Sequence, residues 1–200
     1  MSLITADSIK AVIASYWRYV RQCPVIALEV DSSLDSYSGG ERADVLAVDK
    51  NRFLIETEVK ITLADLRRDA EKSKHRAFRE NLPTRCVARH FYFAIPRDIA
   101  NTASLVCNDL YPYAGVLGVN GLDEYGVEVY RQAKFLAGKR LTYPQVLRII
   151  FNQSATVCRL AKKVGELTRV QRNLDDQLKE YRDMKRLEGG RDGPTNIGAA

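Results

Sequence analysis

Residues 41–75 read ERADVLAVDKNRFLIETEVKITLADLRRDAEKSKH, and this stretch decides the fold. Two apolar runs, ADVLAV and FLIETEVKI, flank the turn-forming segment DKNR, which predicts two neighbouring strands. Within the second run, Glu56, Glu58 and Lys60 recur at every second position. Side chains alternate along a strand, so these three charges share one face. Burying that face is costly unless the charges are paired or bind a metal.

The patterns on either side of this stretch alternate between helix and strand. In chain order they predict a helix (5–22), three strands (24–30, 43–48 and 53–61), a helix (62–81), a strand (88–96), a helix (97–110) and two strands (113–120 and 126–132). Thr5 is the expected N-cap of the first helix, and Thr62 with Asp65 has the spacing of a capping box. This mixture predicts an α/β fold, with a mixed central sheet flanked by helices.

The character of the chain changes after Pro144, where one long helix is expected. Its apolar residues repeat at spacings of three and four over about four heptads: Val157, Leu160, Val164, Leu167, Leu174, Leu178 and Tyr181, with Gln171 at one core position. Such a row needs a partner, which is either a second subunit, giving a homodimer, or the chain's own domain. The predicted organisation is a sheet domain (1–142), a long helix that is a candidate coiled coil (143–188) and a disordered tail (189–200).

Composition narrows the class of protein without naming a function. The 200 residues carry a net charge of +6, which favours an anionic partner. No apolar run approaches the roughly 20 residues of a membrane-spanning helix, and no secretory signal is visible, so we expect a cytoplasmic protein that binds no membrane. The four cysteines are scattered without metal-binding spacing, which indicates free thiols.

The length of the turn at DKNR decides which residue faces Glu58. A three-residue loop, 50–52, places Asp44 opposite Glu58, whereas a loop of two or four residues places Asp44 beside Thr57. Asn51 suits the left-handed conformation that three-residue hairpin loops require. In that register Asp44, Glu56, Glu58 and Lys60 converge on one patch. Clustered carboxylates suit a hard cation such as Mg²⁺ or Mn²⁺, and a nearby lysine could orient the attacking water or neutralise charge on a phosphate.

These residues resemble the PD-(D/E)XK nuclease superfamily, which has an acidic residue on one strand and Glu-x-Lys on the next. RADVLAV followed by FLIETEVKIT carries the likeness, and ADLRRDAEKSKH with FYFAIP is similar to the MmcB-like and resolvase-like DNA-repair branches. The resemblance implies a restriction-endonuclease-like fold. It also implies a Mg²⁺- or Mn²⁺-dependent DNA endonuclease that hydrolyses phosphodiester bonds in repair, recombination, or phage and mobile-element DNA processing.

The resemblance also implies a role for each matching position. Asp44 and Glu58 are the expected metal ligands, Glu29 and Glu56 are further candidate ligands, and Lys60 is the expected catalytic lysine. The neighbouring basic helix, together with the residue before the first strand motif, supplies candidate DNA contacts: Arg42, Arg68, Lys72, Lys74 and His75.

Simpler interpretations stand beside this one. The charged row could be the solvated face of a hairpin with Glu58 and Lys60 as a weak ion pair. The chain could also be a non-catalytic nucleic-acid-binding or scaffold protein that keeps the nuclease fold. Phe91, Tyr92 and Phe93 could stack on bases, but residues of this kind in a strand favour the core.

Overall fold

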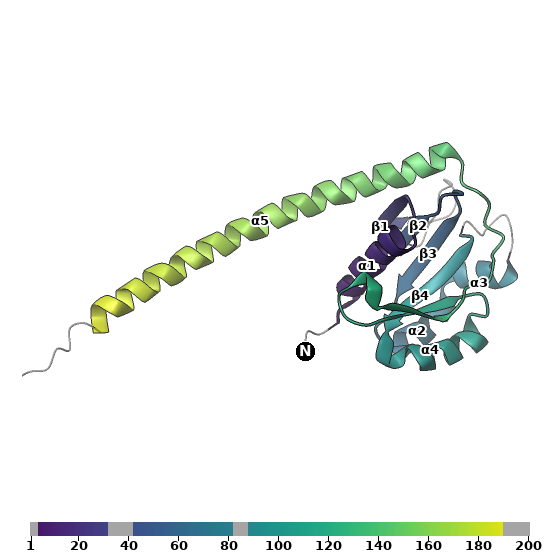
Figure 1. Cartoon of the computed structure of the whole chain (residues 1–200), viewed down its shortest axis with the longest axis horizontal. Helices are drawn as coiled ribbons and strands as arrows, with labels where there is room; N and C mark the ends of the chain where they lie inside the picture. The colour runs from purple at the N-terminus through teal and green to yellow at the C-terminus, as the bar shows by residue number, and fades with distance from the viewer. Residues whose placement is uncertain (1–3, 32–41, 82–87, 190–200) are drawn as a thin grey trace, which may run out of the picture. The chain divides into compact units, whose positions relative to one another are not determined.

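Six strands form one mixed sheet in the computed structural model of the chain (Figure 1), which describes residues 4–31, 42–81 and 88–189. The strands are β1 (Val25–Asp31), β2 (Arg42–Val48), β3 (Leu54–Val59), β4 (His90–Pro96), β5 (Gly115–Val119) and β6 (Val127–Arg131). They lie side by side in sequence order. The β3–β4 and β4–β5 pairs are parallel, and the other neighbouring pairs are antiparallel. The predicted α/β fold with a mixed central sheet flanked by helices is confirmed.

The helices begin close to where their capping residues predict. They are α1 (Ala6–Ser15), α2 (Leu63–Arg68), α3 (Ser73–Glu80), α4 (Arg97–Leu110) and α5 (Tyr143–Gly189), with short helical turns η1 (Tyr16–Val20), η2 (Asp69–Glu71) and η3 (Glu124–Gly126). Thr5 caps α1 in a capping box with Ser8, and the Thr62 hydroxyl accepts the Asp65 N–H at 3.1 Å. The first predicted helix continues past Ser15 as the π-helical turn η1.

One face of the sheet packs against α1 and η1 (Figure 1). Apolar side chains of β2 and β3, such as Val45 and Val59, meet Ile13 and Trp17 there. The indole N–H of Trp17 donates to the hydroxyl of Thr57 at 3.1 Å, so this buried polar pair is satisfied. The odd-numbered residues of β3 therefore face α1.

The opposite face packs against α2, α3 and α4, which Figure 1 shows together on the other side of the domain. Phe91 and Phe93 of β4 are fully buried there, and Tyr92 is buried on the α1 face. The prediction that these aromatic residues belong to the core is therefore correct. Glu56 and Glu58 pair with Phe91 and Phe93 in the β3–β4 register, so the carboxylates of β3 lie on this aromatic side of the sheet.

The chain divides into two compact units, Met1–Ala155 and Thr156–Ala200. The long helix α5 begins at Tyr143, as predicted, but the first unit extends past the predicted boundary at residue 142. The reason is packing: Ile149 is fully buried in a cluster with residues of β1 and β2, and Gln153 accepts the Leu28 N–H at 2.8 Å. The predicted tail lies almost entirely outside the described residues.

The described part of the chain bears on the predictions about membrane-spanning helices and cysteines. No helix in that part is long and apolar enough to cross a membrane. Cys23, Cys107 and Cys158 are free thiols, as predicted. Cys86 lies outside the described residues.

Candidate functional site

The register of β2 and β3 places Asp44 beside Glu58. Val45 pairs with Thr57, and the same register places Asp44 opposite Glu58. The Asp44 carboxylate also accepts the N–H of Val59 at 2.8 Å through Oδ2, which fixes it at the end of β3. The hairpin loop between β2 and β3 therefore has three residues, 50–52, and not two or four.

The left-handed residue of that loop is Arg52 and not the predicted Asn51. Arg52 has a φ of 66°, whereas Asn51 has no positive φ. The Asp49 N–H donates to the Phe53 carbonyl at 3.0 Å and closes the loop. In three-residue hairpin loops a type I turn comes first and the left-handed residue follows it, so the third position takes the positive φ.

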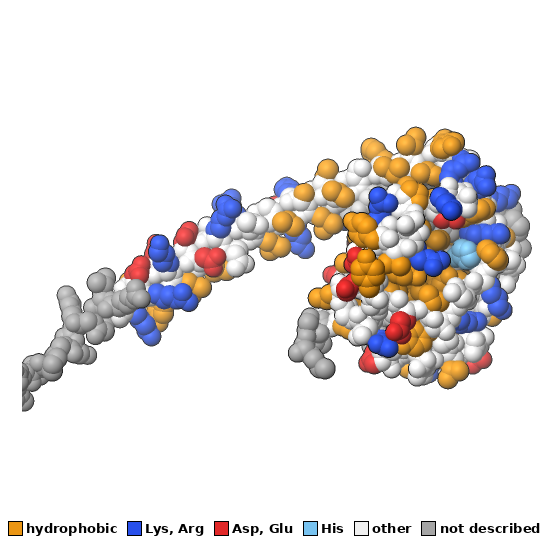
Figure 2. Space-filling model, in the orientation of Figure 1, with side chains coloured by type: hydrophobic (Ala, Val, Ile, Leu, Met, Phe, Trp, Pro, Cys, Tyr) orange, Lys and Arg blue, Asp and Glu red, His pale blue; other side chains and the backbone are white. Residues whose placement is uncertain are grey.

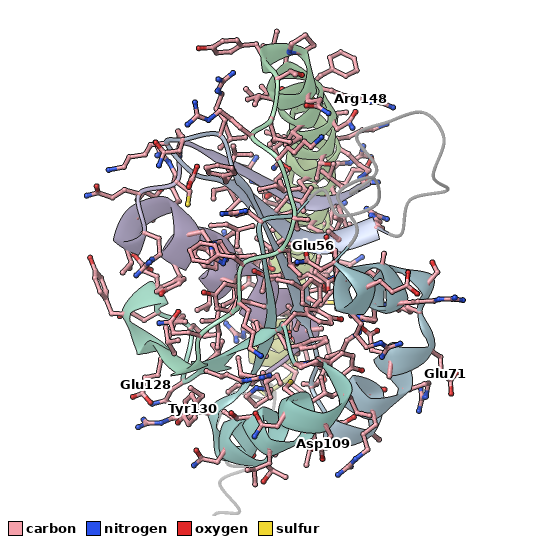
Figure 3. All side chains as sticks on the ribbon, turned by 90° about the vertical axis from the view of Figure 1, so that its right-hand side faces the viewer. Glu56, Glu71, Asp109, Glu128, Tyr130 and Arg148 are labelled. Carbon is pink, nitrogen blue, oxygen red and sulfur yellow. The ribbon has the colours of Figure 1, made fainter. Side chains whose placement is uncertain are left out.

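The charged face of β3 is buried, so the interpretation as a solvated hairpin face is wrong. Glu56 and Glu58 are only 2% and 3% exposed. Figure 3 shows Glu56 in the middle of the domain among other side chains, whereas Glu71 and Asp109 project from its periphery. Carboxylates in such a position need cationic partners, because desolvation of an unpaired charge costs several kcal/mol.

Lys74 of α3 supplies the partner for both carboxylates. Its ammonium nitrogen lies 3.0 Å from Glu56 Oε1 and 2.5 Å from Glu58 Oε1, and its side chain is 10% exposed. Burial raises the pKa of Glu58 to about 7, while Lys74 opposes this effect and the charges of Glu56 and Asp44 add to it. Burial lowers the pKa of Lys74, but the two carboxylates outweigh that effect and raise it overall. Lys74 therefore stays charged.

Asp69 forms a second buried centre beside the first. Its Oδ1 accepts from Lys60 Nζ at 2.6 Å and from Lys72 Nζ at 2.7 Å. Lys60 also lies 3.7 Å from Glu58 Oε2, which links the two centres. Burial by itself would raise the pKa of Asp69, but hydrogen bonds from His75, Lys60 and Lys72 outweigh it and hold the pKa well below its usual range.

Asp69 was not predicted as a site residue, because the helix that carries it is not continuous. The expected helix 62–81 is broken: α2 ends at Arg68, η2 follows, and Lys72 has an extended backbone with a ψ of 141°. A new helix, α3, begins at Ser73. No glycine or proline marks the break in the sequence.

His75 connects Asp69 to the far side of the core. The His75 ring is fully buried, with Nε2 2.7 Å from Asp69 Oδ2 and Nδ1 2.6 Å from the Tyr113 hydroxyl. A carboxylate only accepts, so Nε2–H donates to Asp69 and Nδ1 accepts from Tyr113. Burial lowers the pKa of His75, and the hydrogen bond to Asp69 opposes that effect. The imidazole of His75 is therefore neutral.

A further lysine bridges the carboxylates on the other side of Asp44. Lys10 of α1 lies 2.9 Å from Glu29 Oε1 and 3.3 Å from Asp44 Oδ1. Arg42 Nη2 lies 2.7 Å from Glu29 Oε2. Glu29 has a φ of 53°, which interrupts the regular alternation of β1. Each of the four candidate metal ligands thus contacts a lysine: Glu29 and Asp44 share Lys10, and Glu56 and Glu58 share Lys74.

The candidate DNA contacts differ in how far their side chains are exposed to solvent. Arg68 and Arg42 have side chains that are 72% and 55% exposed, and Lys72 is 40% exposed. Lys74 is held between two carboxylates and His75 is fully buried. Both side chains have their partners inside the domain, so Arg42, Arg68 and Lys72 are the predicted DNA contacts with the more exposed side chains.

Asp44 and Glu58 are the two residues of the site that remain candidate ligands for a magnesium ion. Among residues 4–31, 42–81 and 88–189, no three His, Cys, Asp or Glu side chains form a group that could surround a metal. Mg²⁺ does not require such a cage, because it keeps several waters and is held by one or two carboxylates together with substrate phosphates. Asp44 and Glu58 lie at neighbouring positions in the β2–β3 register, and the Asp44 charge raises the Glu58 pKa. Lys10 and Lys74 contact Glu29 and Glu56 as well as these two residues.

Comparisons with known proteins identify a fold and no function. No protein-family model and no curated protein match the sequence. A solved structure, the SPO1766 protein of unknown function from Silicibacter pomeroyi, is similar with a TM-score of 0.52. The match covers 82% of this chain and 93% of that one at 18% sequence identity. At this identity the likeness concerns the fold alone.

Proposed function

We propose that this protein is a metal-dependent nuclease that hydrolyses phosphodiester bonds of DNA in the cytoplasm, as the PD-(D/E)XK resemblance implies. The observation that carries the proposal is the position of Asp44, whose carboxylate is hydrogen-bonded to the N–H of Val59 and lies opposite Glu58. Lys60 directly follows the last residue of β3. An acidic residue beside Glu-x-Lys is the arrangement on which the resemblance rests.

In this proposal each residue of the site has its own task. Asp44 and Glu58 hold Mg²⁺ or Mn²⁺, which when bound polarises a phosphoryl oxygen and lowers the pKa of a bound water. The Lys60 ammonium donates to Asp69 at 2.6 Å, next to the proposed ligands. A fixed cation next to the ligands stabilises negative charge that develops on the phosphate. Asp69 and His75 hold the Lys60 ammonium in place.

The test is cleavage of a labelled DNA panel with Mg²⁺ or Mn²⁺, using duplex, single-stranded, flapped and four-way substrates. We expect Asp44→Asn and Lys60→Met to lower the cleavage rate by about a hundredfold or more, the typical cost of losing one charge-stabilising group. EDTA should abolish cleavage. Asp109→Asn and Lys162→Met change exposed residues by the same chemistry and should leave the rate unchanged.

The second candidate function is nucleic-acid binding without turnover. The observation that favours it is the neutralisation of the carboxylates by Lys10 and Lys74, which satisfies the buried charges without a metal. DNA binding with no metal-dependent cleavage of any substrate would support this function and contradict the nuclease proposal. Cleavage that survives both site substitutions would contradict the assignment of the site.

The proposal includes a homodimer formed through α5. The apolar row of α5, here called the seam, is exposed, with values such as 46% for Leu160 and 59% for Leu167. β-branched Val157 and Val164 alternate with leucines at heptad spacing. Valine at the first core position with leucine at the second favours parallel two-stranded coiled coils, and one polar core residue, here Gln171, specifies the register.

A further inference from the structure

A second cationic surface lies away from the carboxylates. It consists of three arginines and three aromatic residues, called here the arginine–aromatic patch: Arg52, Arg89, Arg140, Phe53, Phe135 and Tyr143. All six belong to the first compact unit. They come from the starts of β3 and β4, from the segment after β6 and from the first residue of α5. Sequence reasoning singled out none of them.

Stacking on rings holds the guanidinium groups in place. The Arg52 guanidinium carbon lies 4.4 Å from the centroid of the Tyr143 ring. Arg89 lies between two rings, 5.3 Å from Phe53 and 4.7 Å from Phe135. A guanidinium over an aromatic face is attracted by the ring quadrupole, and its N–H groups stay in the guanidinium plane, free to donate.

The described part of the chain contains no ion pair to the arginines of the patch, and none to the neighbouring Lys50 and Lys139. The interior lysines of the candidate site are all paired. Figure 2 shows lysine and arginine side chains gathered with hydrophobic ones on the right-hand side of the domain. Arg89 donates to the Leu136 carbonyl at 3.0 Å, whereas Arg52 and Arg140 donate no side-chain hydrogen bond to residues 4–31, 42–81 or 88–189.

Two of the rings are exposed. Phe135 is 68% and Tyr143 71% exposed, although both are large aromatic residues. Exposed rings next to cationic groups provide what an unpaired nucleotide needs, a surface for the base and a donor for the phosphate. The bases of a duplex are already stacked within the helix and could not use these rings.

The patch and the carboxylates lie at opposite ends of β3. Phe53 precedes the strand and Glu58 is five residues further along it, which at the rise of a strand separates them by about 17 Å. The patch is therefore a separate site and not part of the proposed metal site.

We infer that the arginine–aromatic patch binds single-stranded nucleic acid. Arg52 and Arg140 donate to phosphates, and Phe135 and Tyr143 stack on unpaired bases. The binding does not require the nuclease proposal to be correct, because it uses none of the carboxylates and needs no metal.

The experiment measures fluorescence anisotropy of a labelled oligothymidine in EDTA, with a duplex of the same length in parallel. We expect Phe135→Ala with Tyr143→Ala to weaken single-strand binding by about tenfold per ring and to leave duplex binding almost unchanged. Arg52→Gln with Arg140→Gln should weaken binding and reduce the slope of log affinity against log salt by about 1.4, since each single-strand phosphate contact contributes about 0.7. The matched control, Lys162→Gln with Arg172→Gln, removes two exposed charges of α5 and should bind as wild type.

Each other outcome overturns the inference. Equal losses in the patch and control variants would mean that only net charge matters. Unchanged single-strand binding in both patch variants would place the nucleic acid elsewhere. Displacement of the oligonucleotide by an equal concentration of polyglutamate would reassign the patch to acidic polypeptides. The assay is run in EDTA and measures binding alone, so a failed nuclease proposal and a failed patch would be distinguished.

Discussion

The Glu58 carboxyl makes the stability of the fold depend on pH. Its pKa is raised from 4.5 to about 7 because it is buried, and Lys74 only partly opposes this. Between these two values the folded protein keeps a proton that the unfolded chain releases. The stability that this group contributes is therefore fully present below pH 4.5 and is lost as the pH rises through 7.

Because the stability contributed by Glu58 decreases as the pH rises, a prediction follows for Glu58→Gln, whose side chain cannot titrate. Relative to wild type, the variant should gain unfolding free energy as the pH rises from 4.5 to 8, by up to about 3 kcal/mol. Urea denaturation of both proteins at several pH values measures the difference. Glu71→Gln, at an exposed position, is the control and should follow wild type. Parallel pH curves for wild type and Glu58→Gln would show that the carboxyl is ionised throughout.

For single residues, the sequence indicates the strand side of the site but not the helix side. The period-two row on β3 and the turn length predict that Asp44, Glu56, Glu58 and Lys60 gather, because strand geometry leaves few alternatives. The partners of the row come from separate helices, and no local pattern indicates them. Lys74 in particular looks like an exposed helix residue in the sequence, and only the tertiary packing shows that it lies between two carboxylates.

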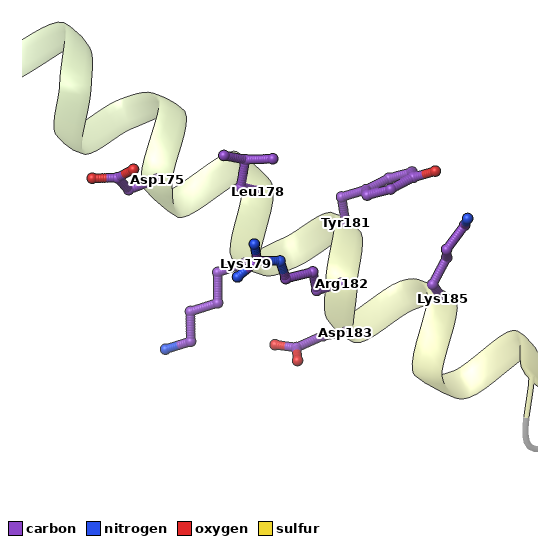
Figure 4. Close-up of a pocket in the computed structure, with 7 residues that line it drawn as sticks. All are labelled: Asp175, Leu178, Lys179, Tyr181, Arg182, Asp183 and Lys185. Carbon is purple, nitrogen blue, oxygen red and sulfur yellow. The ribbon is translucent and has the colours of Figure 1, made fainter. Parts of the chain in front are cut away.

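Among the elements, α5 provides the sharpest test of assembly. Figure 4 shows Leu178 and Tyr181 on one side of the helix and Lys179 and Asp183 on another, the separation that a coiled-coil seam requires. Leu174 lies in the seam, whereas Asn173, its neighbour, lies outside. We expect Leu174→Glu to yield a monomer and Asn173→Glu to remain dimeric.

Sedimentation equilibrium at several concentrations measures this difference, because both variants carry the same added charge. Gln171→Leu should raise the thermal stability of the dimer, since a polar core residue specifies register at a cost in stability. A monomeric wild type at all concentrations would contradict the seam as a dimer interface.

Element boundaries show what local signals can predict. The starts of α1 and α2 follow from Thr5 and Thr62, whose hydroxyls cap the first turns. The break at Lys72 has no such signal. The tertiary contacts of Asp69 with Lys60 and His75 accompany it, so tertiary structure outweighs the helix propensity of the segment there.

For the molecule as a whole, the paired carboxylates predict that folding does not depend on metal. The buried Glu56 and Glu58 have Lys74 as their cationic partner, and the partly exposed Asp44 has Lys10. We therefore expect the same melting temperature with EDTA and without EDTA, in a buffer to which no metal is added, measured by circular dichroism. A large loss of melting temperature in EDTA would mean that a bound ion is part of the folded structure.

The exposed seam of α5 also bears on how tightly a nucleic acid is held. The proposed parallel dimer through α5 would carry two sheet units, and therefore two arginine–aromatic patches. A strand captured by one arginine–aromatic patch would then meet the second at an effective concentration in the millimolar range. Avidity of this kind can exceed the affinity of a single patch by about 10²- to 10⁴-fold without any additional contact. Separating the two chains would therefore release the nucleic acid even though every residue that touches it remained in place.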